Sequence, residues 1–419
     1  MTDNIKNIDT LVIGAGQAGV AMSEHLTHQN VPHLVLEKNR IAEAWRTGRW
    51  DSLVANGPAW HDRFPGMEFP GDKPDQFVPK DQVADYFEAY VDKFKMPVET
   101  DVEVISASRN ESTSGFTVKT SKGTINAQRI VSATGPFQVP IIPAIAPENP
   151  DFLQIHSAKY RNPDNLPAGA IIVIGAGSSG VQIADELRRS GRKVYLSVGP
   201  HDRPPRAYRG RDFVWWLGVL GLWDMAANVP GKEHVTIAVS GANGGDTIDF
   251  RELANQGLNL VGRTQSFENG VVHFSDDLAC NIKAGDENYL SLLDRADQYV
   301  VDNGLDLPEE PEARILLADP DCMVNPTKSL DLKANNVTTV IWATGYATNY
   351  DWLKVDVFDE KNQPQHHRGV SIEPGVYFLG LPWLSRRGSS FIWGVWHDAK
   401  YIADQIVIQR QYQQYQNKI

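Results

Sequence analysis

Short apolar blocks, each followed by a glycine-rich turn and then by helical spacing, mark two places in this chain. At the first, residues 10–13 form an apolar block that predicts a short buried strand. Residues 20–26 then follow an apolar helix pattern, and residues 31–36 form a second apolar block. The order strand, helix, strand predicts a parallel βαβ unit close to the N-terminus.

The turn inside this unit is Gly14-x-Gly16-x-x-Gly19, the spacing of a dinucleotide-binding fingerprint. Gly14 allows a tight turn, Gly16 lets the backbone approach a pyrophosphate, and Gly19 lets the helix pack against the strand. The helix N-terminus offers free N–H groups to the phosphates. Glu37 ends the second strand, where a carboxylate can bind a ribose diol. The alternative is a glycine-rich turn without a ligand.

The same pattern recurs at residues 170–174, followed by Gly175-x-Gly177-x-x-Gly180, a helix over 181–189 and a strand over 193–198. The second strand has no acid at its end. Several arginines follow instead, which favours binding of a 2′-phosphate and therefore of NADPH over NADH. The alternative is that these arginines are only solvent-exposed side chains of a loop. These are Arg203, Arg206, Arg209 and Arg211.

Between the two fingerprints, residues 80–94 have the spacing of an amphipathic helix and residues 100–129 alternate like an antiparallel meander. A strand over 130–135 ends in Ala-Thr-Gly, and the proline-rich stretch 136–150 is expected to be a linker. A strand over 337–342 leads into a second Ala-Thr-Gly, which we interpret as the return of the chain to the first domain near residue 336.

The remaining segments are less regular. Residues 213–223 are unusually apolar and aromatic, which fits a buried helix, the lining of a substrate pocket or a membrane-facing surface. We expect strands and turns over 248–277, a helix over 288–303, a strand over 375–380 and a closing helix over 396–414.

Composition narrows the function. Forty Lys and Arg against 52 Asp and Glu give a net charge of −12, which disfavours binding to nucleic acid and anionic membranes. No apolar run is long enough to span a membrane and no signal core opens the chain. Cys280 and Cys322 form neither a C-x-x-C pair nor a metal-site spacing. We therefore expect a cytoplasmic protein without a metal site or paired redox cysteines.

These features resemble the class B flavin-containing monooxygenases, including the plant auxin-forming enzymes and, more distantly, the Baeyer–Villiger enzymes. Both fingerprints, Glu37 and both Ala-Thr-Gly turns match, and Asp51-Ser52-Leu53 followed by Asn56 resembles the family segment beside the flavin ring. Two departures stand out. Ala42-Glu43-Ala44 replaces the usual glycine pair before Trp45. The family motif between the fingerprints keeps His156 and Tyr160 but has Pro150 and Phe152 at its Phe and Gly positions.

The resemblance implies an α/β fold with two Rossmann-like, three-layer dinucleotide-binding domains, the NADPH domain being inserted into a discontinuous FAD domain. The expected parts are residues 1–150 and 336–419 for FAD and 151–335 for NADPH, with NADH as an alternative. It also implies that reduced flavin adds O₂ to give a C4a-hydroperoxide and passes one oxygen atom to a small substrate.

The implied catalytic residues are three. Asn56 matches the asparagine that lies near the flavin, where its amide can donate to the peroxide, although a turn-forming role is the alternative. His156 belongs to the middle motif, with a structural role as the alternative, and His61 is a candidate only through its proximity in sequence.

The candidate cofactor-binding residues follow from the two fingerprints and the matched segments. For the first domain they are Gly14, Gly16, Gln17, Ala18, Gly19, Glu37, Lys38, Trp45, Arg46, Val102, Ala133, Thr134 and Gly135. For the second domain and its Ala-Thr-Gly turn they are Gly175, Gly177, Ser178, Ser179, Gly180, Ser197, Arg203, Arg206 and Gly345.

Two other functions stay open. An NAD(P)H oxidase or flavin reductase is favoured by the departures in the middle motif, and a non-catalytic nucleotide-binding sensor would need no turnover. The aromatic segment 213–223, with Trp383, Trp393 and Trp396, suggests an apolar or aromatic amine, sulfide or ketone as the substrate. A homodimer is the default expectation for such an oxidoreductase.

Overall fold

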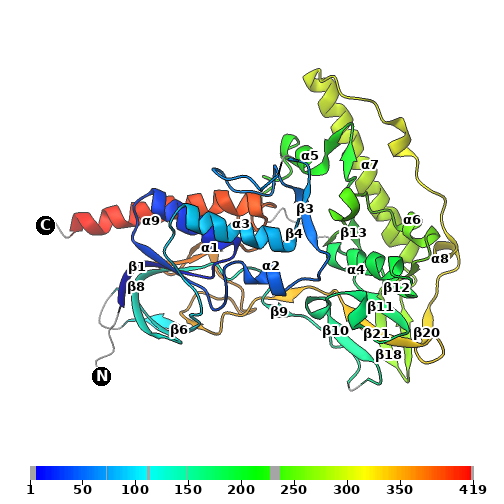
Figure 1. The fold of residues 1–419 in the computed structure, drawn as a ribbon, viewed down its shortest axis with the longest axis horizontal. Helices are drawn as coiled ribbons and strands as arrows, with labels where there is room; N and C mark the ends of the chain where they lie inside the picture. The colour runs from blue at the N-terminus through cyan, green and yellow to red at the C-terminus, as the bar shows by residue number, and fades with distance from the viewer. Residues whose placement is uncertain (1–5, 72, 111–113, 149, 227–235, 417–419) are drawn as a thin grey trace.

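Two sheets, each built on one glycine-rich motif, organise the chain (Figure 1). They are seen in a computed structural model that describes residues 6–71, 73–110, 114–148, 150–226 and 236–416. The element order and the parallel central strands confirm an α/β fold with two Rossmann-like units.

In the first sheet, β1 (Lys6–Ile13) lies between β2 (His33–Leu36) and β8 (Gly123–Ser132), and all three are parallel. The parallel part is completed by β5 (Val98–Glu99) beside β2 and β26 (Val376–Phe378) beside β8. The predicted meander forms its antiparallel part, in which β6 (Val104–Arg109) pairs with β7 (Phe116–Thr120) and β7 pairs with β8. The short strands β23 (Leu353–Lys354), β24 (His366–His367) and β25 (Val370–Ser371) add to it. The sheet is thus assembled from both ends of the chain.

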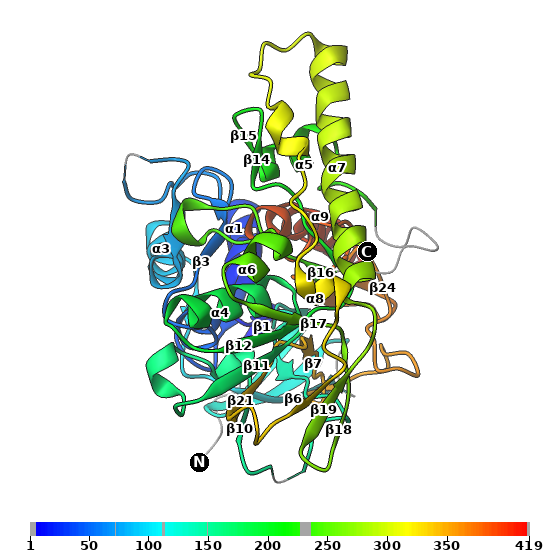
Figure 2. The ribbon, with the colours of Figure 1, turned by 90° about the vertical axis from the view of Figure 1, so that its right-hand side faces the viewer.

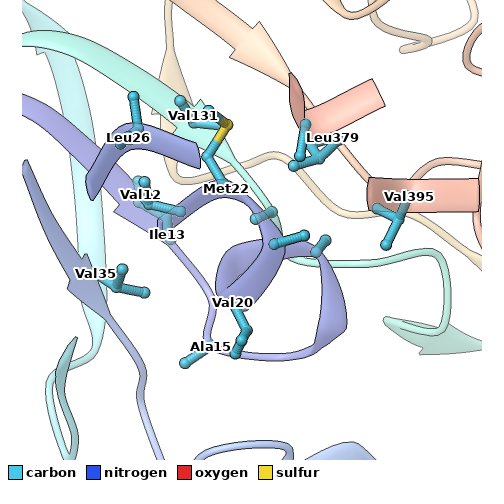
Figure 3. Packing of buried hydrophobic residues seen from close by; sticks show 14 of the residues in the cluster. Val12, Ile13, Ala15, Val20, Met22, Leu26, Val35, Val131, Leu379 and Val395 are labelled. Atoms are coloured by element: carbon cyan, nitrogen blue, oxygen red, sulfur yellow. The ribbon is translucent and has the colours of Figure 1, made fainter. Parts of the chain in front are cut away.

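Three helices lie over this sheet: α1 (Gln17–His28), α3 (Lys80–Lys93) and α9 (Ile392–Gln416) (Figure 1). The apolar stripe predicted for α3 is buried, with Tyr90 and Phe87 completely inaccessible. Figure 3 shows Met22 of α1 beside Val131 of β8, and Val20 of α1 beside Ala15 of the glycine-rich turn; Val12 of β1 and Val395 of α9 belong to the same core. Burial of this apolar surface fixes the helix over the strands that carry the first fingerprint.

The second sheet is entirely parallel, in the order β10 (Leu153–His156), β21 (Val337–Trp342), β11 (Ala170–Ile174), β12 (Val194–Ser197) and β17 (Asn259–Val261). Helix α4 (Ser178–Arg189) packs on one face through Val181 and Ile183. An antiparallel sheet packs on the other face through Val272 and Phe274. Its strands are β18 (Thr264–Glu268), β19 (Val271–Phe274) and β20 (Ser329–Asp331). The unit therefore has three layers, as expected.

Two expectations about the second unit were wrong. Strand β21, which we placed in the first domain, pairs with β10 and β11 in the second sheet, so the chain returns only after Trp342. The stretch 248–277 also contains a helix, α6 (Phe250–Asn255), besides its strands. Asp249 caps this helix because its side chain accepts hydrogen bonds from the N–H groups of Arg251 and Glu252.

The chain crosses between the units twice, and the two crossings pair as β9 (Val139–Pro140) and β22 (Tyr346–Ala347). The predicted linker 136–150 contains the first crossing. Other segments near the junction are α2 (Glu43–Thr47) and the paired strands β3 (Val54–Pro58) and β4 (Phe77–Pro79).

The rest of the second unit comprises short elements and one long helix. The short strands pair as β13 (His201–Asp202) with β16 (Thr236–Ile237) and β14 (Ala207–Tyr208) with β15 (Arg211–Asp212). Helix α7 (Leu278–Asn303) starts earlier than predicted and projects from the body (Figure 2), and α8 (Asp321–Val324) follows it. The aromatic segment forms α5 (Phe213–Val219), whose Trp216 is fully buried, so the interpretation as a buried helix is confirmed. Across the described ranges, no helix combines the length and apolar character needed to cross a membrane.

Candidate cofactor-binding sites

The first glycine-rich turn has the geometry that its sequence predicts. Gly14 has φ +104°, and a Cβ there would lie 2.6 Å from the carbonyl oxygen of Ala133. A Cβ on Gly19 would lie 1.8 Å from the carbonyl oxygen of Gly14, so helix and strand meet only because both are glycine. Gly16 caps α1 without a side-chain hydrogen bond, and a Cβ there would meet no atom within 4 Å. The N–H groups at the start of α1 therefore face open space suited to an anion.

Glu37 is fixed beside this turn. Its Oε2 accepts a hydrogen bond from the Ala15 N–H at 2.9 Å, and its Oε1 accepts one from the Asn39 N–H at 2.9 Å. Both oxygens keep lone pairs that can accept further hydrogen bonds. The carboxylate is thus held where the fingerprint places the ribose of the bound dinucleotide.

A cavity of about 850 Å³ extends over this turn. Its volume is within the range of cofactor sites. Gln17 borders it, donating from Nε2 to the Ser390 carbonyl at 2.8 Å and accepting from Trp45 Nε1 at 3.3 Å. Most predicted FAD residues line the cavity: Gly14, Gly16, Gln17, Ala18, Glu37, Lys38, Trp45, Val102, Ala133, Thr134 and Gly135. The open helix terminus, the fixed carboxylate and the glycine-lined cavity fit FAD.

Two predicted FAD residues lie elsewhere. Gly19 packs against Gly14 beneath the turn rather than facing the cavity. Arg46 was predicted to bind the cofactor, but its Nη2 forms ion pairs with Asp85 at 2.9 Å and Glu88 at 3.0 Å on α3. Its guanidinium therefore ties α2 to α3.

The cavity also has walls that the sequence did not reveal. Arg49, Phe137, Gln138, Gly380 and Ser390 line it. Of these residues, only Ser390 could have been predicted from the sequence, because it lies just before the start of α9, where free backbone N–H groups are expected. The others come from a linker and from loops whose placement depends on contacts distant in sequence.

The second glycine-rich turn repeats the geometry of the first. Gly175 has φ +105°, and a Cβ there would lie 2.5 Å from the carbonyl oxygen of Ala343. A Cβ on Gly180 would lie 1.8 Å from the carbonyl oxygen of Gly175. Each Ala-Thr-Gly turn therefore lies against the first glycine of its own fingerprint. This explains why β21 belongs to the second sheet.

The N-terminus of α4 differs from that of α1 in its surroundings. A Cβ on Gly177 would lie 2.2 Å from Cγ2 of Thr236, and Ser178 Oγ donates to the Ile237 carbonyl at 2.8 Å. Strand β16 therefore lies at the point where a second pyrophosphate is expected. Ser179 follows in the first turn of α4. Ser197, at the end of β12, is buried and donates to the Gly262 carbonyl at 3.0 Å.

Two of the four arginines proposed to read a 2′-phosphate, Arg203 and Arg206, are already engaged. Arg203 is buried and donates from Nε to Asp286 at 2.9 Å, with its guanidinium 4.4 Å above the Tyr289 ring. Arg206 is buried, pairs with both oxygens of Asp212 and donates to the Asn56 carbonyl at 2.6 Å. Burial with full pairing leaves neither guanidinium free, so the structure contradicts that role for both.

The three catalytic candidates lie outside the lining of the first cavity. Asn56, on β3, accepts a hydrogen bond from Gln182 of α4 at 3.0 Å. His61 contacts Asp62 through Nδ1 at 2.8 Å, and its ring stacks on Trp223 and Trp393 with centroids 5.4 and 5.7 Å away. These two residues therefore lie between the fingerprint helix α4 and an aromatic cluster.

His156 connects the second Ala-Thr-Gly turn to the end of β10. Its Nδ1 accepts from the Ala158 N–H at 3.1 Å, so Nε2 carries the proton and donates to the Gly345 carbonyl at 3.0 Å. Burial lowers the pKa of His156, which keeps this tautomer neutral. These contacts support the structural alternative for the histidine, and Gly345 is the residue that it holds.

Cys280 and Cys322 are free thiols that do not line the first cavity. A search of the described residues finds no group of three His, Cys, Asp or Glu side chains that could hold a metal ion.

Comparison with known proteins agrees with this picture. The family model of pyridine nucleotide-disulphide oxidoreductases matches residues 11–208. An uncharacterized CzcO-like oxidoreductase of Geobacillus kaustophilus is 35% identical over 96% of this chain and 98% of its own length. The probable indole-3-pyruvate monooxygenase YUCCA4 of Arabidopsis thaliana is 24% identical, covering 95% of this chain and 90% of the plant protein. The flavin-containing monooxygenase from Stenotrophomonas maltophilia superposes with a TM-score of 0.68 at 18% identity, covering 97% and 99% of the two chains.

Fold and site together define an oxidoreductase with two dinucleotide sites, of the class that uses FAD and NADPH. The chain belongs to the class B flavin-containing monooxygenase family, and within it to the CzcO-like oxidoreductases.

Proposed function

We propose that the protein is an NADPH-dependent flavoprotein monooxygenase that transfers one atom of O₂ to a small apolar or aromatic substrate through a C4a-hydroperoxyflavin. The observation that carries this proposal is the cavity of about 850 Å³ on the first fingerprint, together with a second complete fingerprint in the same chain. FAD would supply the redox chemistry, accepting a hydride from NADPH and activating O₂.

The residues of the chain would hold and orient the cofactors. The N–H groups at the start of α1 bind the pyrophosphate of FAD, and Glu37 accepts hydrogen bonds from its ribose. Gln17 and Trp45, bonded to each other, close one wall of the site. The start of α4 binds NADPH at Gly177 and Ser178, where β16 must give way to the phosphates.

An aromatic cluster supports the proposed substrate class. Trp223 and Trp393 both stack against His61 and lie beside each other with centroids 6.2 Å apart, and Phe391 packs edge-on against Trp223 with centroids 5.1 Å apart. Such rings favour apolar and aromatic amines, sulfides or ketones. Trp396, also considered for this role, packs instead on His25 and Phe64 in the first core.

We further propose that the protein is a homodimer and that it is located in the cytoplasm.

The second candidate is an uncoupled NADPH oxidase, favoured by Pro150 and Phe152 at two positions of the family motif. Turnover of the FAD-loaded protein with NADPH separates the two functions when thioanisole, an aromatic amine, a cyclic ketone or a small hydrophilic amine is supplied. A monooxygenase forms oxygenated product and less peroxide than the NADPH it consumes. Peroxide equal to NADPH with all four compounds identifies the oxidase. Turnover of the hydrophilic amine alone contradicts the substrate class.

A further inference from the structure

Arg49 is a partly buried cation in the wall of the FAD cavity, and no carboxylate in the described ranges forms an ion pair with it. Its Nη1 donates to the carbonyl of the preceding Gly48 at 3.3 Å, and the Tyr346 hydroxyl is a further hydrogen-bonding partner of the guanidinium. Burial lowers the pKa of Arg49, yet a guanidinium stays charged in proteins. A cation removed from water without a counter-charge is costly, so its retention here points to an anion that binds from outside the chain.

The most deeply buried arginines of the described chain all have acidic partners. The four arginines with the lowest exposure, Arg129, Arg203, Arg206 and Arg251, each form an ion pair with an aspartate. Arg49 differs from these four because it lacks a carboxylate partner among the described residues and because it lines the cavity.

The surroundings of Arg49 indicate where the anion would lie. The guanidinium stands 4.5 Å above the ring of Phe137, which packs edge-on against Tyr346 at 5.2 Å. Tyr346 belongs to β22, where it pairs with Pro140 of β9, and Phe137 lies two residues before β9. The next residue, Trp50, is buried in the core of the second unit. Arg49 therefore lies where the cavity meets the NADPH-binding unit, whereas the pyrophosphate of FAD already has the N-terminus of α1.

We propose that Arg49 is an anion-binding residue for the ligand that joins FAD at this junction, holding either a carboxylate of the substrate or a phosphate of the nicotinamide nucleotide. A guanidinium can donate two parallel hydrogen bonds to either group. The proposal depends on the FAD site and not on oxygen transfer, so failure of the monooxygenase assay leaves it standing.

Calorimetric titration of the FAD-loaded protein with matched pairs of compounds tests it. Benzoate against benzamide measures the preference for a carboxylate, and ADP against adenosine measures the preference for a phosphate. Arg49→Gln removes the charge, and Arg49→Lys keeps it without the planar fork. Arg368→Gln is the control, because it changes an exposed arginine that does not line the cavity.

The proposal predicts that Arg49→Gln weakens binding of benzoate or of ADP by about tenfold or more, since hydrogen bonds between charged groups contribute that much. Affinity for the neutral compound of each pair stays the same, the affinity of Arg49→Lys for the anion falls between those of wild type and Arg49→Gln, and Arg368→Gln matches the wild type. Weaker binding of benzoate identifies the substrate carboxylate as the anion, and weaker binding of ADP identifies the phosphate of the nicotinamide nucleotide. Unchanged affinity of Arg49→Gln for both anions overturns the proposal. Purification of Arg49→Gln without flavin also overturns it, because the guanidinium would then serve the pyrophosphate of FAD.

Discussion

The carboxylate of Glu37 accepts a hydrogen bond from the backbone N–H of Ala15 at 2.9 Å, which joins the end of β2 to the glycine-rich turn before α1. One oxygen thereby orients the acid while the group remains able to bind the ribose of FAD. The pairing connects the two halves of the fingerprint, which are 22 positions apart in sequence. It makes Glu37 part of the turn itself.

Replacement of this acid tests its double role. Glu37→Ala removes the acceptor for the N–H groups of Ala15 and Asn39 and for the ribose, so we expect FAD to bind about tenfold to a hundredfold more weakly. Reconstitution of the apoprotein with FAD measures the change. Glu99→Ala, which alters an acid paired only with exposed Lys6, serves as the control. Equal FAD affinity in both variants would contradict the assignment of Glu37.

The glycines of the first turn predict two different defects. Gly16→Ala places a methyl group in open space at an ordinary φ of −79°, so the apoprotein should keep its melting temperature while FAD binding weakens severely. Gly19→Ala drives a methyl group into the Gly14 carbonyl, so the apoprotein itself should melt at a lower temperature. Thermal denaturation with and without FAD distinguishes them. A destabilised Gly16→Ala apoprotein would show that the space above α1 is not a ligand site.

The buried pair of Arg203 and Asp286 predicts a structural effect in place of a change in nucleotide preference. Arg203→Gln leaves Asp286 with only Arg251 as a charged partner, and we expect the free energy of unfolding to fall by about 3 kcal/mol. Urea denaturation measures this loss. The ratio of kcat/KM for NADPH to that for NADH should remain that of the wild type. A variant that keeps its stability but selectively loses activity with NADPH would instead support binding of the 2′-phosphate by Arg203.

A buried histidine predicts a pH dependence of stability. His25 on α1 contacts the Trp396 carbonyl at 3.1 Å, and burial lowers its pKa from 6.5 to about 4. The unfolded chain therefore binds the proton first, so stability is complete above pH 6.5 and falls as the pH drops toward 4, by up to about 1.4 kcal/mol per pH unit. His25→Gln cannot titrate and should lose less stability over this window. If the free energy of unfolding falls equally with pH in the wild type and in His25→Gln, the lowered pKa of His25 is contradicted.

The sequence predicted both βαβ units because local periodicity and glycine spacing are fixed by neighbouring residues. It misplaced β21, since the apolar pattern of a strand does not say which sheet it joins. The decisive contact, between Ala343 and Gly175, spans most of the second unit. Its parallel with Ala133 and Gly14 was visible in the repeated Ala-Thr-Gly, although only the structure shows what that repeat contacts.

Side-chain partners were harder to predict than strands. Arg203 stands among arginines that suggest a phosphate site, yet its partner Asp286 lies 83 positions away on α7. Arg49 carried no motif, and its environment arises from linkers that pair only in the folded protein. Short sequence patterns report backbone geometry well, whereas the pairing of a charge depends on distant segments.

The central claim is tested most directly by stopped-flow spectroscopy of the FAD-loaded protein, reduced by NADPH without oxygen and then mixed with aerated buffer. We predict a transient flavin species whose absorbance spectrum differs from those of the reduced and the oxidised flavin, and which persists before the oxidised flavin forms. Immediate return of oxidised flavin with stoichiometric hydrogen peroxide would contradict monooxygenase function.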